Sequence, residues 1–99
     1  MAKQSIELKV AGDTHAPGAA GALVMNFQEG KTVTIVAIGA GAVNQMTKAC
    51  AIARRMGEDN GIKLVFIPEF TQEQVQGMET TGLRFRVESE QEIWERIHV

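Results

Sequence analysis

The sequence contains few of the residues from which disulfides and metal sites are built. Cys50 is the only cysteine, so no disulfide can form within the chain. The two histidines, His15 and His98, stand toward opposite ends of the sequence, which leaves too few ligands for a site of histidine and cysteine. We therefore expect the protein to hold neither a metal nor a cofactor.

Long hydrophobic runs are also missing. The longest nearly apolar stretch covers eleven residues from Val33 to Val43, and Gly39 and Gly41 interrupt it. A helix that crosses a bilayer needs about 20 apolar residues, and the polar start of the chain offers no apolar signal segment. We expect a cytoplasmic protein that does not associate with membranes.

Aromatic side chains are scarce, with four phenylalanines, one tryptophan and no tyrosine among 99 residues. Hydrophobic residues still make up 44% of the chain, which is typical of one globular domain rather than a disordered protein. A core of small and β-branched side chains buries little area per residue, and small domains often gain stability by assembly. We therefore expect a homodimer or a larger homo-oligomer.

Neither sign of charge dominates, and the net charge is −2. Residues 1–87 hold nine lysines and arginines against eight acidic residues, whereas residues 88–99 hold four glutamates against Arg96 alone. The acidity therefore belongs to the C-terminal tail. A nearly neutral body neither requires nor excludes a polyanionic partner such as DNA or RNA.

Hydrophobic periodicity predicts the order β-α-β-α-β-β, followed by a short C-terminal helix. Asp13, Thr14 and Pro17 are expected to open the first helix, Gly57 to follow the second, and Pro68 to stop the third strand. The expected strands cover residues 5–10, 31–38, 62–67 and 83–87; the second and terminal helices cover 42–56 and 90–98, and a polar connector covers 69–81. Because β-α-β crossovers are right-handed, we expect an α/β (α+β) fold with a small mixed four-stranded sheet and two helices on one face.

The segment from Ala37 to Gln45 reads Ala-Ile-Gly-Ala-Gly-Ala-Val-Asn-Gln, and Lys48-Ala49 and Ala51-Ile52-Ala53-Arg54 continue it. With the flanking motifs Ala19-Ala20-Gly21-Ala22-Leu23, Ile67-Pro68, Phe70-Thr71 and Gly77, it resembles the signature of the sporulation stage V protein S family over residues 5–88. The tail from Ser89 onward departs from that pattern. We therefore expect one domain over residues 1–88 and an acidic helical extension over 89–99.

That family is similar in fold to the Alba chromatin proteins, whose element order is also β-α-β-α-β-β. The resemblance implies a dimer, a role in binding DNA or RNA, and a regulatory role in bacterial development or sporulation. It does not imply catalysis.

Three polar residues, Asn44, Lys48 and Arg55, recur on one face of the second predicted helix, with Ala51 between them. The face is either solvated and without further function, or a ridge on which Asn44 donates hydrogen bonds and the two cations contact phosphates. Arg54 lies one residue away and would join from the flank.

The turn Gly39-Ala40-Gly41 lies where a strand meets a helix, a place where backbone N–H groups bind anions. It lacks the third glycine of a dinucleotide fingerprint, because position 44 is asparagine. Either it is a tight turn packed between strand and helix, or it contacts an anion or a nucleic-acid backbone.

Arg84 and Arg86 alternate along the fourth predicted strand, beside Lys9 if the first strand pairs nearby. They are either ordinary exposed strand residues or further phosphate contacts. The 69–81 connector holds three glutamates and no basic residue, which disfavours an Alba-like grip on duplex DNA and is more compatible with RNA or a protein partner.

Residues suited to catalysis are few. Cys50 falls on the apolar stripe of the second helix, where a core role is expected rather than a nucleophile. His15 has no acidic partner nearby in sequence, and neither Ser5 nor Ser89 lies in a nucleophile elbow. We expect a protein that is not an enzyme.

Two functions remain in competition: a nucleic-acid-binding regulator that acts as a homo-oligomer, and an assembly or adaptor module that contacts only proteins. A domain that senses anions or nucleotides at the Gly39 turn is a third. The terminal helix is expected to dock Trp94 onto its own sheet or onto a neighbouring subunit, because about nine residues are too few for a stable isolated helix.

Overall fold

Four strands and three helices follow one another in the order that the periodicity predicts. The structure is a computed structural model that describes residues 3–98; residues 1–2 and 99, the ends of the two expected units, lie outside it. The elements are β1 (Ser5–Val10), α1 (Ala16–Gln28), β2 (Thr32–Ala37), α2 (Ala40–Asp59), β3 (Leu64–Val75), β4 (Met78–Ser89) and α3 (Glu90–Ile97).

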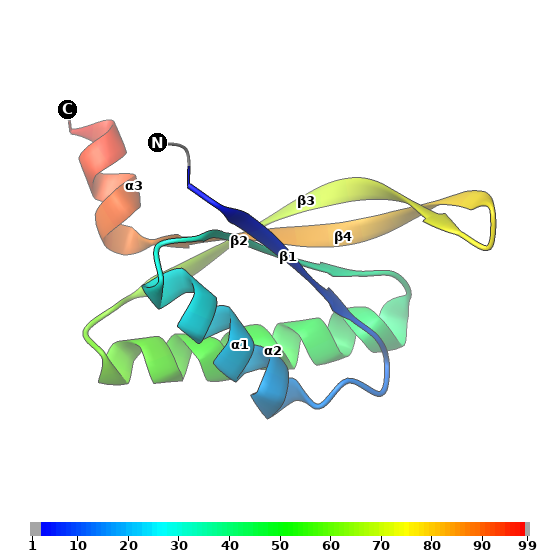
Figure 1. The fold of residues 1–99 in the computed structure, drawn as a ribbon, viewed down its shortest axis with the longest axis horizontal. Coiled ribbons are helices and arrows are strands. Elements are labelled where there is room, and N and C mark those ends of the chain that lie inside the picture. The colour runs from blue at the N-terminus through cyan, green and yellow to red at the C-terminus, as the bar shows by residue number, and fades with distance from the viewer. Residues whose placement is uncertain (1–2, 99) are drawn as a thin grey trace.

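The strands form one mixed sheet in the order β1-β2-β4-β3. β1 and β2 are parallel, whereas β4 runs antiparallel to both β2 and β3. Helices α1 and α2 lie side by side beneath one face of the sheet, and α3 leaves the end of β4 on the other side (Figure 1). The expected α+β class and the placement of two helices on one face are therefore confirmed.

The core lies between the sheet and these two helices. Val33 and Ile35 of β2 are fully buried there against Leu23 of α1 and Met46 of α2. Both helices carry fully buried alanines, whose small side chains allow α1 and α2 to approach each other closely: Ala20, Ala49 and Ala53. The small side chains therefore build the core, as the composition indicates.

Cys50 belongs to this core. Its side chain is buried among the α2 residues that face the sheet, and burial raises the pKa of its thiol to about 12. The thiol therefore stays protonated at neutral pH, and a thiolate is the form that acts as a nucleophile. Its position agrees with a core role.

The helix ends differ from the expected ones. Thr14 does not cap α1: its side chain accepts a hydrogen bond from the Ala11 N–H at 2.8 Å, and His15 occupies the cap position without a side-chain bond. α2 begins at Ala40 and runs to Asp59, past Gly57. A Cβ atom at Gly57 would lie 2.9 Å from the carbonyl oxygen of Ile62, so this glycine permits close approach and does not end the helix.

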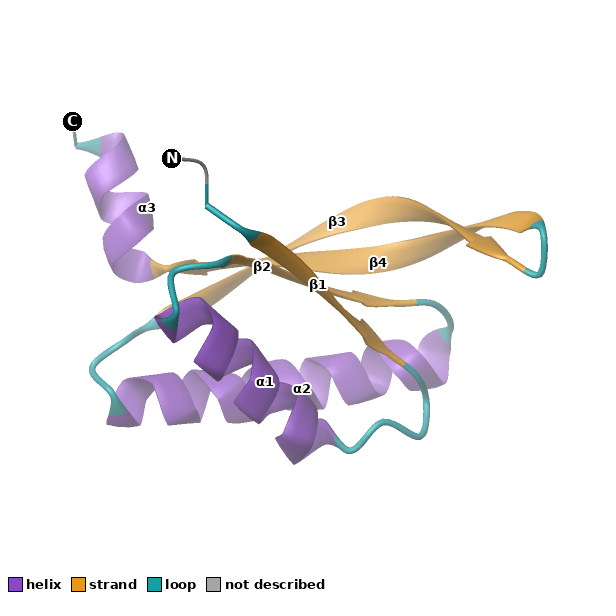
Figure 2. Ribbon diagram, viewed as in Figure 1, coloured by secondary structure: helices purple, strands orange, loops and turns teal. Residues whose placement is uncertain are grey.

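The expected polar connector over residues 69–81 is wrong. β3 continues through Pro68, and β3 and β4 pair from Leu64↔Ser89 out to Val75↔Met78. Gln76 and Gly77 form the two-residue turn with φ angles of 51° and 79°, both positive as in a type I′ hairpin. Because β3 is an edge strand, it tolerates proline where an N–H would face solvent. Residues 69–81 of this hairpin are called the hairpin arm, and from Thr71 onward the arm extends beyond the pairing with β2 (Figure 2).

The terminal helix α3 forms where it was expected, but it does not dock on its own sheet. Trp94 is 58% exposed and stacks on the His98 ring, with 3.5 Å between ring centroids. Ser89 and Glu92 form a capping box at the start of the helix, which supplies local stability in place of a buried face. The expected docking onto its own sheet is wrong, and docking onto a neighbouring subunit stays a prediction.

Two helical glycines give opposite expectations for substitution by alanine. Gly57→Ala should lower the free energy of unfolding by about 1–2 kcal/mol, because the added Cβ meets a backbone carbonyl and overpacks the site. Gly21→Ala is the matched control: a Cβ there meets no heavy atom within 4 Å, so helix propensity should raise stability by up to about 1 kcal/mol. Urea unfolding of both variants measures the difference, and a stabilised Gly57→Ala protein would contradict the close approach.

Candidate nucleic-acid interface

The outer face of α2 carries the three polar residues that sequence analysis grouped together. Asn44, Lys48 and Arg55 are all exposed, as is Ala51 between them, whereas Met46 on the opposite side is buried. At 100° per residue the three side chains start within about 40° of one another around the axis, and they span roughly 16 Å along it. We call Asn44, Lys48 and Arg55 the α2 ridge.

The two cations of the α2 ridge are not neutralised by the protein. Over residues 3–98, no carboxylate oxygen lies within 4.0 Å of the charged nitrogens of Lys48 or Arg55. Arg54 differs, because its Nε lies 3.6 Å from a carboxylate oxygen of Glu58, one helical turn further on. The ridge therefore offers two unpaired positive charges, and Arg54 is partly committed to an internal ion pair.

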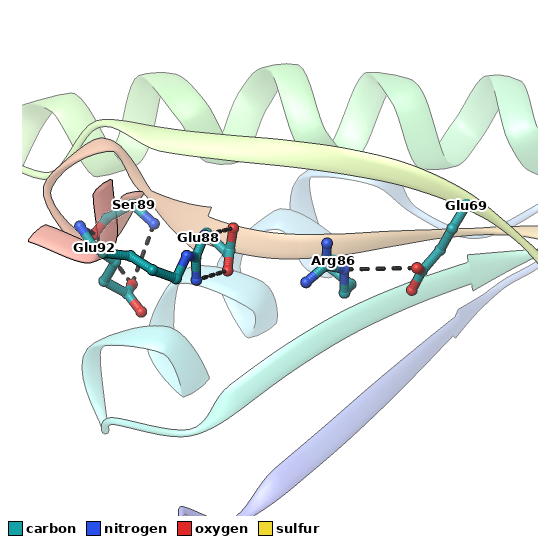
Figure 3. A network of polar contacts seen from close by, with 6 residues as sticks. Glu69, Arg86, Glu88, Ser89 and Glu92 are labelled. Carbon is teal, nitrogen blue, oxygen red and sulfur yellow. Dashed lines mark hydrogen bonds and ion pairs between the residues drawn. The ribbon is translucent and has the colours of Figure 1, made fainter. Parts of the chain in front are cut away.

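Arg84 and Arg86 lie elsewhere, on the face of the sheet that the helices leave open. Both share Glu69: Arg84 Nε lies 2.9 Å from one carboxylate oxygen and Arg86 Nε 3.6 Å from the other. Figure 3 shows Arg86 directed toward Glu69 along the sheet. Lys9 is not a direct neighbour of these arginines, because β2 lies between β1 and β4. Val36 stands between Lys9 and Arg84 in the register. The sheet separates these arginines from the α2 ridge, so the six basic and polar candidates do not form one surface.

The Gly39 turn is held in place by small side chains and one long hydrogen-bonding residue. Gly39 adopts a φ of 93°, which favours glycine, and no side chain caps the first turn of α2. Gly41 packs against Gly12, and Gln45 donates a hydrogen bond from Nε2 to the Thr14 carbonyl at 2.8 Å. The positive φ accounts for the glycine at position 39, and Gln45 is a structural residue whose role only the tertiary contact reveals.

A cavity of about 420 Å³ lies beside this turn. Its walls include Gly39 and Gly41, with Lys9 from β1 and Glu73 from the hairpin arm. An anion in this cavity would meet one cation and one carboxylate, and these oppose each other. Anion binding at Gly39, Ala40 and Gly41 therefore stays a prediction.

The hairpin arm exposes apolar side chains that the periodicity did not single out. Phe70 is 78% exposed, and Val75 and Met78 flank the turn with large exposed fractions. The arm also holds Glu73 and Glu79 and no basic residue. The Gln76-Gly77 pair, followed by residues of high strand propensity, was the signal that could have predicted the hairpin.

An ion pair ties the tail to the open face of the sheet. Arg96 donates two hydrogen bonds to Glu88, at 2.8 and 2.9 Å, and these bonds hold the pKa of Glu88 below its usual range. Ser89 and Glu92 of the capping box lie next to Glu88 (Figure 3). The acidic excess of the tail is thus partly offset where α3 leaves the sheet.

These features define a small mixed α+β domain with an unpaired basic ridge on one long helix. Over residues 3–98 no cluster of three or more potential metal ligands occurs, and no helix is long and apolar enough to span a membrane. A model of the family described as Stage V sporulation protein S (SpoVS) matches residues 6–90. The chain therefore belongs to the SpoVS family, as its motifs predicted, and is a sporulation-related protein.

The Glu88–Arg96 pair predicts a pH dependence of the tail. Since the pKa of Glu88 is lowered in the folded protein, the pair stabilises α3 above the usual glutamate pKa, and this contribution is lost as pH falls through the lowered value. Arg96→Gln should therefore loosen α3 near neutral pH, and its difference from the wild type should vanish as pH falls through the lowered pKa of Glu88. Emission of Trp94 and far-UV circular dichroism between neutral pH and about pH 3 follow the transition. Lys63→Gln removes a cation that has no part in this pair; coincident curves for Arg96→Gln and wild type would contradict the prediction.

Proposed function

We propose that this protein is a nucleic-acid-binding regulator of sporulation that acts as a homo-oligomer and is not an enzyme. The observation that carries the proposal is the α2 ridge, where Lys48 and Arg55 are exposed, aligned and unpaired. Unpaired cations release condensed counterions when they meet phosphates, which supplies most of the affinity of non-specific binding. Membership of a sporulation family supports the biological setting.

The ridge suits contact with a phosphate backbone rather than with base edges. Lys48 and Arg55 are two helical turns apart, about 10 Å, and Asn44 at the helix start adds a side-chain donor. Such contacts position a nucleic acid without reading its sequence. The acidic hairpin arm opposes a duplex that would follow the arm, so we propose a single-stranded RNA or another short polyanion as the better ligand.

A second candidate, a protein assembly module, is favoured by the hairpin arm. Phe70, Val75 and Met78 are exposed on one extension, and large apolar side chains gathered on a surface are typical of protein contacts. The same arm would be unfavourable against phosphates. This candidate predicts that substitutions in the arm, and not those in the α2 ridge, abolish the partner interaction.

The double reversal Lys48→Glu with Arg55→Glu should abolish RNA retention while the far-UV circular dichroism spectrum stays unchanged, because both side chains are exposed and unpaired. Mobility shifts with a short single-stranded RNA and a duplex DNA of the same length, at about 50 and 200 mM salt, measure the loss. Wild-type protein that retains neither probe at low salt would overturn the proposal.

The matched control is Lys3→Glu with Lys63→Glu, which changes the net charge equally at positions outside α2. Retention that falls equally in the control would show an effect of net charge rather than of the ridge. Arg84→Gln with Arg86→Gln tests the open face of the sheet. Loss of binding there, with the ridge variant unaffected, would move the interface to the opposite side of the protein.

A further inference from the structure

β1 is an edge strand whose outer side no strand of residues 3–98 covers. The other edge strand, β3, contains Pro68, and proline on an edge strand blunts pairing with another chain. β1 contains no proline and no bulge, and it pairs with β2 in continuous register from Ser5 to Val10. Of the two edges, β1 is the one built to accept a further strand.

The hydrogen bonds to β2 establish which residues of β1 point outward. The Gln4 carbonyl accepts from the Thr32 N–H at 2.8 Å, so Gln4 directs its backbone groups toward β2. Backbone direction alternates along a parallel strand, so Glu7 and Lys9 direct their N–H and C=O groups to the open edge. Both side chains are exposed, and neither takes part in an ion pair among the described residues.

The sequence of β1 is complementary to itself in one antiparallel register. When two copies pair about a two-fold axis at Leu8, Glu7 of each copy lies directly opposite Lys9 of the other. These residues then exchange both backbone hydrogen bonds and form an ion pair on the open face of the sheet. Leu8 meets Leu8 of the second copy on the helix face, where it is only half-buried in one chain.

The neighbouring registers are unfavourable. Because only outward-pointing residues can exchange hydrogen bonds across the new edge, the register shifts in steps that move the axis from Leu8 to Glu7 or to Lys9. An axis at Glu7 puts two carboxylates opposite each other, and an axis at Lys9 puts two ammonium groups together. Like charges directly opposite destabilise a strand pair, so the charges select the register centred on Leu8.

From this complementarity we infer that two copies of this protein pair through their β1 edges and form one continuous sheet, with the two-fold axis at Leu8. The inference rests only on the homo-oligomer part of the proposed function and is independent of nucleic-acid binding. α1 lies on the same side of the molecule as β1 (Figure 2), and it contacts both β1 and β2. In the dimer the two α1 helices lie about 10 Å apart, close to the distance of packed helices.

The side chains on the outer part of α1 are compatible with that approach. Gly18 is exposed, Gly21 and Ala22 are half-buried, and a Cβ at Gly21 meets nothing within 4 Å. Met25 is the one large apolar side chain of α1 that is mainly exposed. A second α1 would cover it, as an interface requires.

Charge reversal tests the pairing in solution. Glu7→Lys and Lys9→Glu should each raise the dimer dissociation constant about tenfold or more, since each puts like charges opposite one another. Combining the two substitutions restores opposite charges and should return the constant to near the wild-type value. Sedimentation velocity over a concentration series measures it, with Asp59→Lys and Lys63→Glu as controls of equal charge change away from β1. Wild-type protein that is monomeric at micromolar concentration, or a double variant as weak as the single ones, would overturn the inference.

Cross-linking tests the register itself. Leu8→Cys puts two thiols at the two-fold axis, where Cα atoms of a non-hydrogen-bonded pair are about 4.5 Å apart, within disulfide range. Mild oxidation should yield a covalent dimer, whereas Ile6→Cys, which faces Val10 of the second copy, should not. The native Cys50 is buried and contributes no background. Cross-linking of Ile6→Cys in preference to Leu8→Cys would reject the register, and failure of both would reject the interface, whatever the outcome of the RNA measurements.

Discussion

Strand β2 is buried on both faces of the sheet and paired along both edges, and the positions of the other elements follow from it. Val33 and Ile35 are covered by the helices, and Val36 on the opposite face is only 2% exposed. β2 pairs with β1 in parallel and with β4 antiparallel, so its register sets which side chains of both neighbours face the core. A slip of one residue would turn each apolar set to the wrong face. This burial explains why the strand carries no charged residue, whereas β1 and β4 alternate apolar with charged residues.

Packing against β2 also explains which elements could be predicted from the sequence. α1 and α2 each bury a stripe at helical spacing against β2 and its neighbours, so their existence and order were evident. The hairpin arm has no such stripe, because its strands are stabilised by pairing with each other, as between Gln72 Nε2 and Thr81 Oγ1 at 3.1 Å. Its turn uses Gln76 where asparagine is usual for a positive φ, so the turn signal was weak. Pro68 predicted the end of the third strand, but β3 continues through it because an edge strand tolerates proline.

Only part of the candidate site could likewise be predicted from the sequence. The exposure of Asn44, Lys48 and Arg55 follows from periodicity alone, because a helix with one buried stripe must expose the other side. Whether an arginine is neutralised depends on strand register, which the sequence did not provide. Glu69 lies directly opposite Arg84 only because β3 continues past Pro68. Because β3 extends into the arm, Glu69 neutralises Arg84 and Arg86, whereas Lys48 and Arg55 of the α2 ridge stay unpaired.

The unpaired cations lie on α2 and the paired arginines lie on the open face of the sheet. The proposed dimer would place the α2 cations of both copies on one side. A two-fold axis through an antiparallel strand pair stands perpendicular to the sheet, so both helix layers lie on the same side of the continuous sheet. The order across that layer is then α2, α1, α1 and α2, which separates the two α2 ridges by roughly 30 Å at packed-helix spacing. If the ridges bind phosphates as proposed, two ridges on one side would act on a single flexible polyanion as a bivalent site, because the first contact raises the effective concentration for the second. In the proposed dimer, symmetry would therefore place both α2 ridges on one side of a protein whose chains each have a net charge of −2, while Arg84 and Arg86 on the open face are paired with Glu69.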